Sequence, residues 1–148
     1  MQKEYSDKTA EYVQKKTAEI FNKFKNSQHF SNMFKYCQKE AKWVVEELGS
    51  FAYGYELIQP EDWSLDVFLM QVFNIERKCM YSNTFFKALP KVIYHFSLFC
   101  QENNIGHFNK EEIEQYYKDL KNGELDFHSS WEEAYKARQK LYKDLMGD

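Results

Sequence analysis

Hydrophobic residues recur at intervals of three or four along most of the chain, as they do on one face of an α-helix. The clearest stripe covers residues 30–48 and is followed by Gly49, a residue suited to the left-handed conformation just beyond a helix end. An earlier stripe runs from Val13 to Phe24 behind Ser6, whose hydroxyl can cap a helix. We therefore predict a first helix that begins after Ser6 and ends near the polar run KNSQ, and a second over 30–48.

The stretch 49–62 contains two glycines, a proline and three aromatic residues, and we expect a packed connection there. A third, short helix is expected after Asp62 or Ser64, either of which can cap it. Its predicted buried side consists of Leu65, Phe68, Leu69, Val72 and Phe73.

A fourth stripe follows Ser82 or Asn83, a new pair of capping candidates. Its apolar positions are Phe86, Leu89, Ile93, Phe96 and Cys100. Pro90 lies inside this stripe, where proline removes a hydrogen bond and costs about 3 kcal/mol. Because the stripe stays in phase across the proline, we predict a continuous helix over 83–103 that is kinked at Pro90, rather than a loop.

Two capping boxes predict further helices, Asn109 with Glu112 before a stop at Gly123, and Ser130 with Glu133 near the C-terminus. Only five glycines and two prolines leave little material for hairpin turns. Aromatic residues make up 18% of the chain, so the core should be built from rings. The predicted fold class is all-α, a single compact bundle of five or six helices over residues 1–148, with the Pro-kinked helix at its centre.

The sequence predicts no membrane segment, since no apolar run approaches the roughly 20 residues needed to cross a bilayer. The polar N-terminal sequence also lacks the apolar stretch of a secretory signal. Cys37, Cys79 and Cys100 form an odd set without CxxC spacing, as expected of reduced and mostly buried thiols. We therefore expect a cytoplasmic protein.

Motifs for catalysis and metal binding are missing from the sequence. None of the four histidines has a metal-ligand spacing, and there is no nucleophile elbow or glycine-rich phosphate loop, so we expect no metal, no cofactor and no catalytic residue. His95, in an apolar helix, is interpreted as a hydrogen-bonded core residue. The alternative of a small enzyme requires a pocket in which His95 or a carboxylate has a perturbed pKa.

The aromatic residues between 67 and 100 mostly fit the helical stripes and so predict core packing. Four of them fall partly off the stripes: Tyr81, Phe85, Tyr94 and Phe99. Such rings either cover a neighbouring helix or form an exposed patch that binds a partner. These four are the candidate partner-binding residues.

A basic face is the alternative surface feature. Its candidate nucleic-acid-binding residues are Lys15, Lys16, Lys23, Lys25, Lys87 and Lys91. Against nucleic acid stand the net charge of −3 and the presence of only two arginines, the residue best shaped for phosphate and guanine contacts. Binding that weakens steeply with ionic strength would distinguish this alternative.

Residues 62–105 contain Trp63 before a short helix, the run FLMQVF, the basic pair Arg77 and Lys78, and the run LPKVIYHFSLF. This pattern resembles a helical domain of uncharacterised bacterial and archaeal proteins, some of them associated with SEC-C motifs or plasmid-borne reading frames. The resemblance implies a helical fold and a bacterial or mobile-element origin. It implies no zinc site, because the SEC-C cysteines have no counterpart here.

These observations favour a non-enzymatic protein-interaction module or adaptor that binds another protein through an aromatic or charged helix face. The alternative function is that of a nucleic-acid-binding accessory protein that uses the lysine-rich face. No membrane partner is expected.

Overall fold

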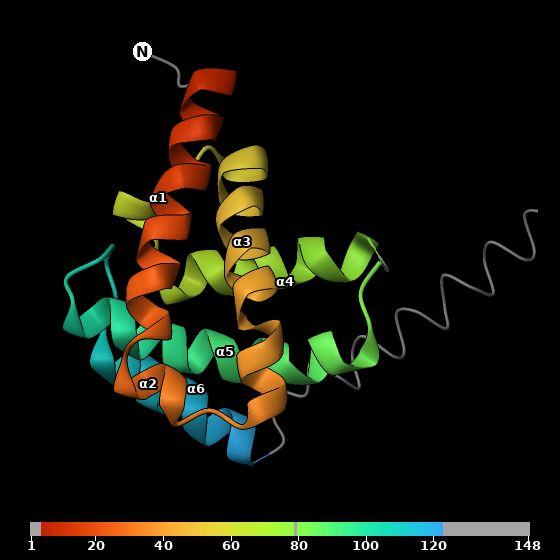
Figure 1. Ribbon diagram of the computed structural model, residues 1–148, viewed down its shortest axis with the longest axis vertical. Helices are drawn as coiled ribbons and strands as arrows, with labels where there is room; N and C mark the ends of the chain where they lie inside the picture. The colour runs from red at the N-terminus through yellow and green to blue at the C-terminus, as the bar shows by residue number, and fades with distance from the viewer. Residues whose placement is uncertain (1–3, 79, 123–148) are drawn as a thin grey trace, which may run out of the picture.

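The computed structural model describes residues 4–78 and 80–122, and within them the chain is built from helices without strands (Figure 1). The elements are α1 (Asp7–Lys25), α2 (Gln28–Ser31), α3 (Lys35–Glu56), the 3₁₀ turn η1 (Pro60–Asp62), α4 (Leu65–Lys78), α5 (Asn83–Glu102) and α6 (Lys110–Lys121). The upright helices α1 and α3 pack side by side, α3 packs across α4 and α5, and α6 packs on α5. The predicted all-α bundle is confirmed.

Helix α1 begins where the capping pattern places it. The Ser6 hydroxyl accepts a hydrogen bond from the backbone N–H of Thr9 at 3.0 Å. The backbone N–H of Ser6 in turn donates to the Tyr53 hydroxyl at 2.9 Å, which ties the start of α1 to α3. The helix ends at Lys25, within the predicted polar run.

The predicted helix over 30–48 is wrong at both ends. Phe34 has extended backbone (ψ 152°) and separates the short α2 from α3, which continues through Gly49 to Glu56. The helix stops at Leu57, which adopts the left-handed conformation (φ 57°) expected of a helix-ending glycine. The stretch 49–62 is therefore largely helical, and the connection is shorter than predicted.

Gly49 serves close packing rather than helix termination. A Cβ atom at this position would lie 2.8 Å from Oγ1 of Thr17 on α1 and 3.3 Å from the ring of Trp63. Glycine therefore lets α3 approach α1 and Trp63 more closely than any larger residue would.

Aromatic rings fill the core, as predicted. Phe96 of α5 lies at its centre, with ring centroids 5.1 Å from Phe24 of α1, 5.8 Å from Trp63 and 5.8 Å from Phe68 of α4. All four side chains are fully buried. Each buried ring removes a large apolar area from water, so this cluster is a main source of stability.

Helix α5 continues through Pro90, so the predicted continuous helix is confirmed. Its start is also as predicted, because the Ser82 hydroxyl accepts from the N–H of Phe85 at 3.1 Å. The carbonyl of Pro90 accepts a hydrogen bond of 2.9 Å from the buried Tyr116 hydroxyl of α6. This hydrogen bond therefore joins α6 to α5 at Pro90.

Ser64 directly precedes α4, and its hydroxyl accepts a hydrogen bond from the N–H of Val67 at 3.1 Å, as predicted. Phe68 and Val72 are buried, but Phe73 is 62% exposed, so its prediction as a core residue is wrong. Phe73 lies on the opposite side of the helix from the residues that face α3 and α5, because it is five residues from Phe68.

Asn109 caps α6 as predicted, since its side chain accepts from the N–H groups of Glu111 and Glu112. The helix ends at Lys121, close to the predicted stop. The second box, Ser130 with Glu133, lies outside the described residues, so its helix and the domain extent over 1–148 stay predictions. Within residues 4–78 and 80–122 the number of α-helices agrees with the expected five or six, although α2 was not among those predicted.

The two glycines inside α3 should respond in opposite ways to alanine. Gly49→Ala inserts a methyl group into a filled contact and should lower the free energy of unfolding by about 1 to 3 kcal/mol. Gly54→Ala, where nothing lies within 4 Å, should raise it by about 0.5 to 1 kcal/mol through helix propensity. Urea unfolding of both variants measures this, and a Gly49→Ala variant as stable as Gly54→Ala would contradict the packing described.

Candidate functional site

Three of the four candidate partner-binding rings belong to the core. Tyr81, Phe85 and Phe99 are buried, so they cannot form the exposed patch that was one interpretation of their positions. Trp43 of α3 covers two of them, with ring centroids 5.0 Å from Tyr81 and 4.9 Å from Phe85. Phe85 and Phe99 are buried although they fall off the stripe, because α5 is covered on more than one side. Tyr94 alone of the four remains partly exposed.

Tyr94 lies in a groove of about 510 Å³ between the α2–α3 segment, α5 and α6, which we call the Tyr94 groove. Its walls are Asn32, Met33, Phe34 and Cys37 from the first segment, Lys91, Tyr94 and His95 from α5, and Tyr117, Leu120 and Lys121 from α6. The volume is within the range of pockets that hold a small molecule or a few peptide side chains.

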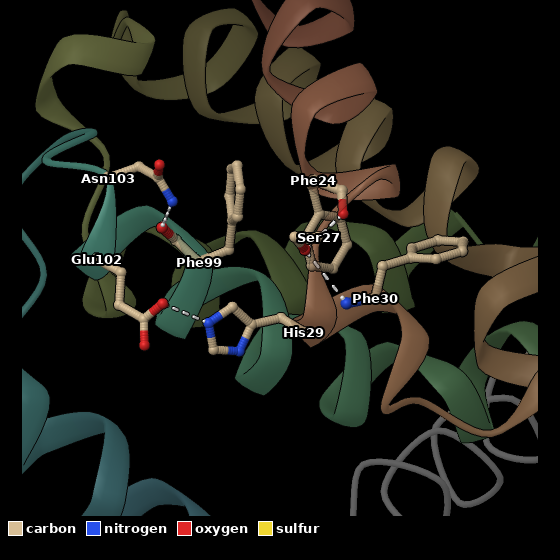
Figure 2. A network of polar contacts seen from close by, with 7 residues as sticks. All are labelled: Phe24, Ser27, His29, Phe30, Phe99, Glu102 and Asn103. Carbon is tan, nitrogen blue, oxygen red and sulfur yellow. Dashed lines mark hydrogen bonds and ion pairs between the residues drawn. The ribbon is translucent and has the colours of Figure 1, made fainter.

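The first wall is held by polar contacts between α2 and α5. Figure 2 shows His29 pointing toward Glu102 across the two helices, with Nε2 and the carboxylate 2.7 Å apart. The Ser27 hydroxyl caps α2 by accepting from the N–H of Phe30 at 3.3 Å, and it donates to the carbonyl of Phe24 at 2.6 Å. These bonds fix the residues that follow α2 beside α5.

The opposite wall is held by the hydrogen bond between Tyr116 and Pro90 and by ring stacking. The rings of Tyr94 and Tyr117 stack at 4.6 Å with an interplanar angle of 23°. Burial raises the pKa of Tyr94, with Tyr117 and Glu114 adding to the effect, so its hydroxyl stays protonated at neutral pH. The groove therefore has a neutral, aromatic side.

Two lysines lie over aromatic rings at the groove. The Lys91 ammonium is 5.1 Å from the ring centroid of Phe34, and it donates a hydrogen bond of 2.6 Å to the Tyr36 hydroxyl. The Lys121 ammonium is 4.8 Å from the ring centroid of Tyr117. Each cation is attracted to its ring face and so has a preferred place. No carboxylate pairs with either ammonium among the described residues.

His95 lines the same groove and is not the hydrogen-bonded core residue that the sequence suggested. It is half-buried, and its Nδ1 atom is buried without a hydrogen-bond partner. Burial, and secondly the nearby His29, lower the pKa of His95 to about 4. The imidazole is therefore neutral at pH 7.

Cys37 is the nucleophile candidate of the groove, and its environment does not activate it. Burial raises the pKa of the Cys37 thiol, although a hydrogen bond from Tyr36 and the charge of Lys91 act in the opposite direction. A protonated thiol is a poor nucleophile. Cys37 and Cys100 are both buried and unpaired, as predicted for the cysteines, whereas Cys79 lies outside the described residues.

The structure brings few of the predicted basic residues to this site. Lys15, Lys16, Lys23 and Lys25 belong to α1, and Lys87 and Lys91 belong to α5. Of these six, Lys91 is the one that lines the Tyr94 groove, and Lys16 lies 3.8 Å from Glu19. Sequence reasoning missed Phe34, Tyr117 and Lys121. The spacing of four between Tyr117 and Lys121 is a signal that could have joined those two.

A second groove, of about 650 Å³, lies between α1 and α3. Four of its lining residues are acidic: Asp7, Glu11, Glu46 and Glu47. The Tyr53 hydroxyl in its wall is already bonded to Ser6, so it has a structural role. Among residues 4–78 and 80–122, no three His, Cys, Asp or Glu side chains are placed to hold a metal ion. The Tyr94 groove is therefore the better candidate.

The sequence matches no family model, and no curated protein or solved structure is significantly similar to it. The resemblance of residues 62–105 to a helical domain stays a prediction. The described helices include none that is both long and apolar enough to cross a membrane.

The low pKa of His95 predicts a pH dependence of stability. Because the unfolded chain binds a proton near pH 6.5 and the folded chain only near 4, the free energy of unfolding should fall as the pH drops through this window. Between pH 7 and 5 we expect His95 to contribute a loss of about 1 to 2 kcal/mol.

Urea unfolding of the parent and of His95→Asn at both pH values isolates this contribution. The variant should lose that much less stability than the parent on acidification. An equal loss in both proteins would contradict the buried, neutral state described for His95.

Proposed function

We propose that this domain is a non-enzymatic protein-interaction module, and that its Tyr94 groove binds an acidic segment of a partner protein. The observation that carries the proposal is the pair of ammonium groups, Lys91 and Lys121, held over ring faces beside the stacked Tyr94 and Tyr117. Such a surface matches a ligand that presents carboxylates next to an apolar or aromatic side chain.

Each part of the groove suits a different part of such a segment. The rings of Phe34, Tyr94 and Tyr117 offer apolar area to a side chain. Lys91 and Lys121, which have no carboxylate partner among the described residues, offer charge to acids on either side of it. The neutral His95 adds a polar ring to the lining without adding a charge.

Binding fits the groove better than catalysis does. A small enzyme needs a nucleophile or base active at neutral pH, whereas Cys37 is protonated and His95 is a weak base with a pKa of about 4. The neutral state of both groups is an advantage in a binding site, where it avoids an unpaired buried charge.

Nucleic acid is the second candidate ligand, because stacked rings beside lysines also bind single strands. The net charge of −3 opposes it, and so does the fact that Lys91 is the one groove residue among the six predicted lysines. We favour a peptide for these reasons. We further propose that the protein acts in the cytoplasm and is of bacterial or mobile-element origin; the unpaired Cys37 and Cys100 suit a reducing compartment.

Selection from a displayed library of random peptides tests the proposed function. Peptides that bind the parent should be enriched in Asp and Glu next to Trp, Tyr or Phe. A double variant, Lys91→Glu with Lys121→Glu, should weaken binding of the selected peptides by at least about tenfold, measured by fluorescence polarisation.

The matched control is Lys15→Glu with Lys23→Glu, which changes the net charge equally on exposed positions of α1. It should bind the peptides as the parent does. Equal loss in both double variants would mean that net charge alone attracts the peptides. Oligonucleotide binding that weakens steeply with salt and is lost in the groove variant would replace the peptide with a nucleic acid.

A further inference from the structure

Helix α4 carries an apolar and charged stripe on the side that faces away from the core. The stripe consists of Asp66, Met70, Phe73 and Arg77, which are exposed, with Met70 at 47% and Phe73 at 62%. The opposite side of the helix, with Phe68, is buried. The four stripe residues are separated by four, three and four positions, which is the spacing of the contact seam between two paired helices.

The α4 stripe is self-complementary, because a second copy that runs in the opposite direction places an opposite charge at each charged position and an apolar side chain at each apolar position. Asp66 and Arg77 lie equally far from the midpoint of the stripe, and so do Met70 and Phe73. If two copies of α4 pack antiparallel about a two-fold axis at that midpoint, Asp66 meets Arg77 of the second copy and Met70 meets Phe73. Each contact occurs twice, as in any isologous interface.

We propose that the α4 stripe is a self-association surface, through which two copies of this chain pair by antiparallel packing of α4. In this pairing, each charged end of the stripe meets an opposite charge on the second copy. The two large exposed apolar side chains between the ends are covered. It uses a different surface from the Tyr94 groove and does not depend on the function proposed for that groove.

The charges at the ends of the α4 stripe are available for such contacts. Neither Asp66 nor Arg77 forms an ion pair within the part of the chain that the structure describes. The guanidinium carbon of Arg77 is 5.6 Å from the ring centroid of Phe73. A guanidinium that stacks on a ring keeps its N–H groups free at the edge, where they can donate to a carboxylate in a bidentate manner.

The size of the surface makes the association weak. A single helix pair buries less than the roughly 1,200 Å² typical of stable complexes, so a dissociation constant of roughly 100 µM is expected. The domain should therefore be monomeric when dilute and increasingly dimeric in the high micromolar range.

Charge reversal in separate copies gives a test that controls for folding. Asp66→Arg leaves two arginines on the stripe, and Arg77→Asp leaves two aspartates, so each variant alone should self-associate at least tenfold more weakly than the parent. Mixed together, the two variants restore opposite charges at both ends of the stripe. The mixture should therefore associate with an affinity within about threefold of the parent.

Sedimentation equilibrium of the full chain from 10 µM to 1 mM, with one variant fluorescently labelled in the mixture, measures these affinities. Association of the mixture also shows that both variants are folded. Glu11→Arg, an equal charge reversal on exposed α1, should associate like the parent. A parent that stays monomeric up to 1 mM would overturn the proposal. It would do so even if residues 123–148 or another protein turned out to cover the stripe. A mixture no tighter than its components would overturn it too.

Discussion

The packing of Phe96 against Phe24 and Trp63 joins two separate parts of the chain to the middle of α5. Trp63 reaches this position because the chain approaches it closely from two sides. Gly49 leaves room beside its ring, and Gly106 (φ 67°) passes so near its backbone that a Cβ there would lie 2.4 Å from the Trp63 carbonyl oxygen. Two glycines without Cβ atoms thus make the central aromatic contact possible, and the rest of the bundle is arranged around it.

Because the packing of Phe96 holds the core face of α5, the opposite face of this helix also has a fixed position. With Phe96 in the core, Lys91 and Tyr94 on α5 point into the Tyr94 groove. The neighbouring elements are fastened to α5 by polar bonds, from His29 of α2 to Glu102 and from Tyr116 of α6 to Pro90. Core packing and the shape of the groove therefore depend on the same helix.

Local signals in the sequence were sufficient for most helix starts, because a capping hydroxyl such as that of Ser6 or Ser82 acts on the next turn alone. Contacts between distant residues were not predictable in this way. Gly49 looks like a helix end in the sequence, and its place inside α3 is explained by the proximity of Thr17 and Trp63. The site was partly predictable for a similar reason. The spacing left Tyr94 and Phe85 equally open to core packing or exposure, and Tyr94 remains partly exposed. The burial of Phe85 depends on a covering helix that its own spacing does not reveal.

The proposed binding of an acidic partner segment in the Tyr94 groove depends on how the core face of α5 positions that groove. Mapping amide chemical shifts by NMR during titration with a selected acidic peptide tests it most directly. The largest changes should fall in residues 32–37, 91–95 and 117–121, with the Phe96 amide little affected. Changes centred on the acidic groove between α1 and α3, or spread evenly over the lysines of α1, would contradict the account.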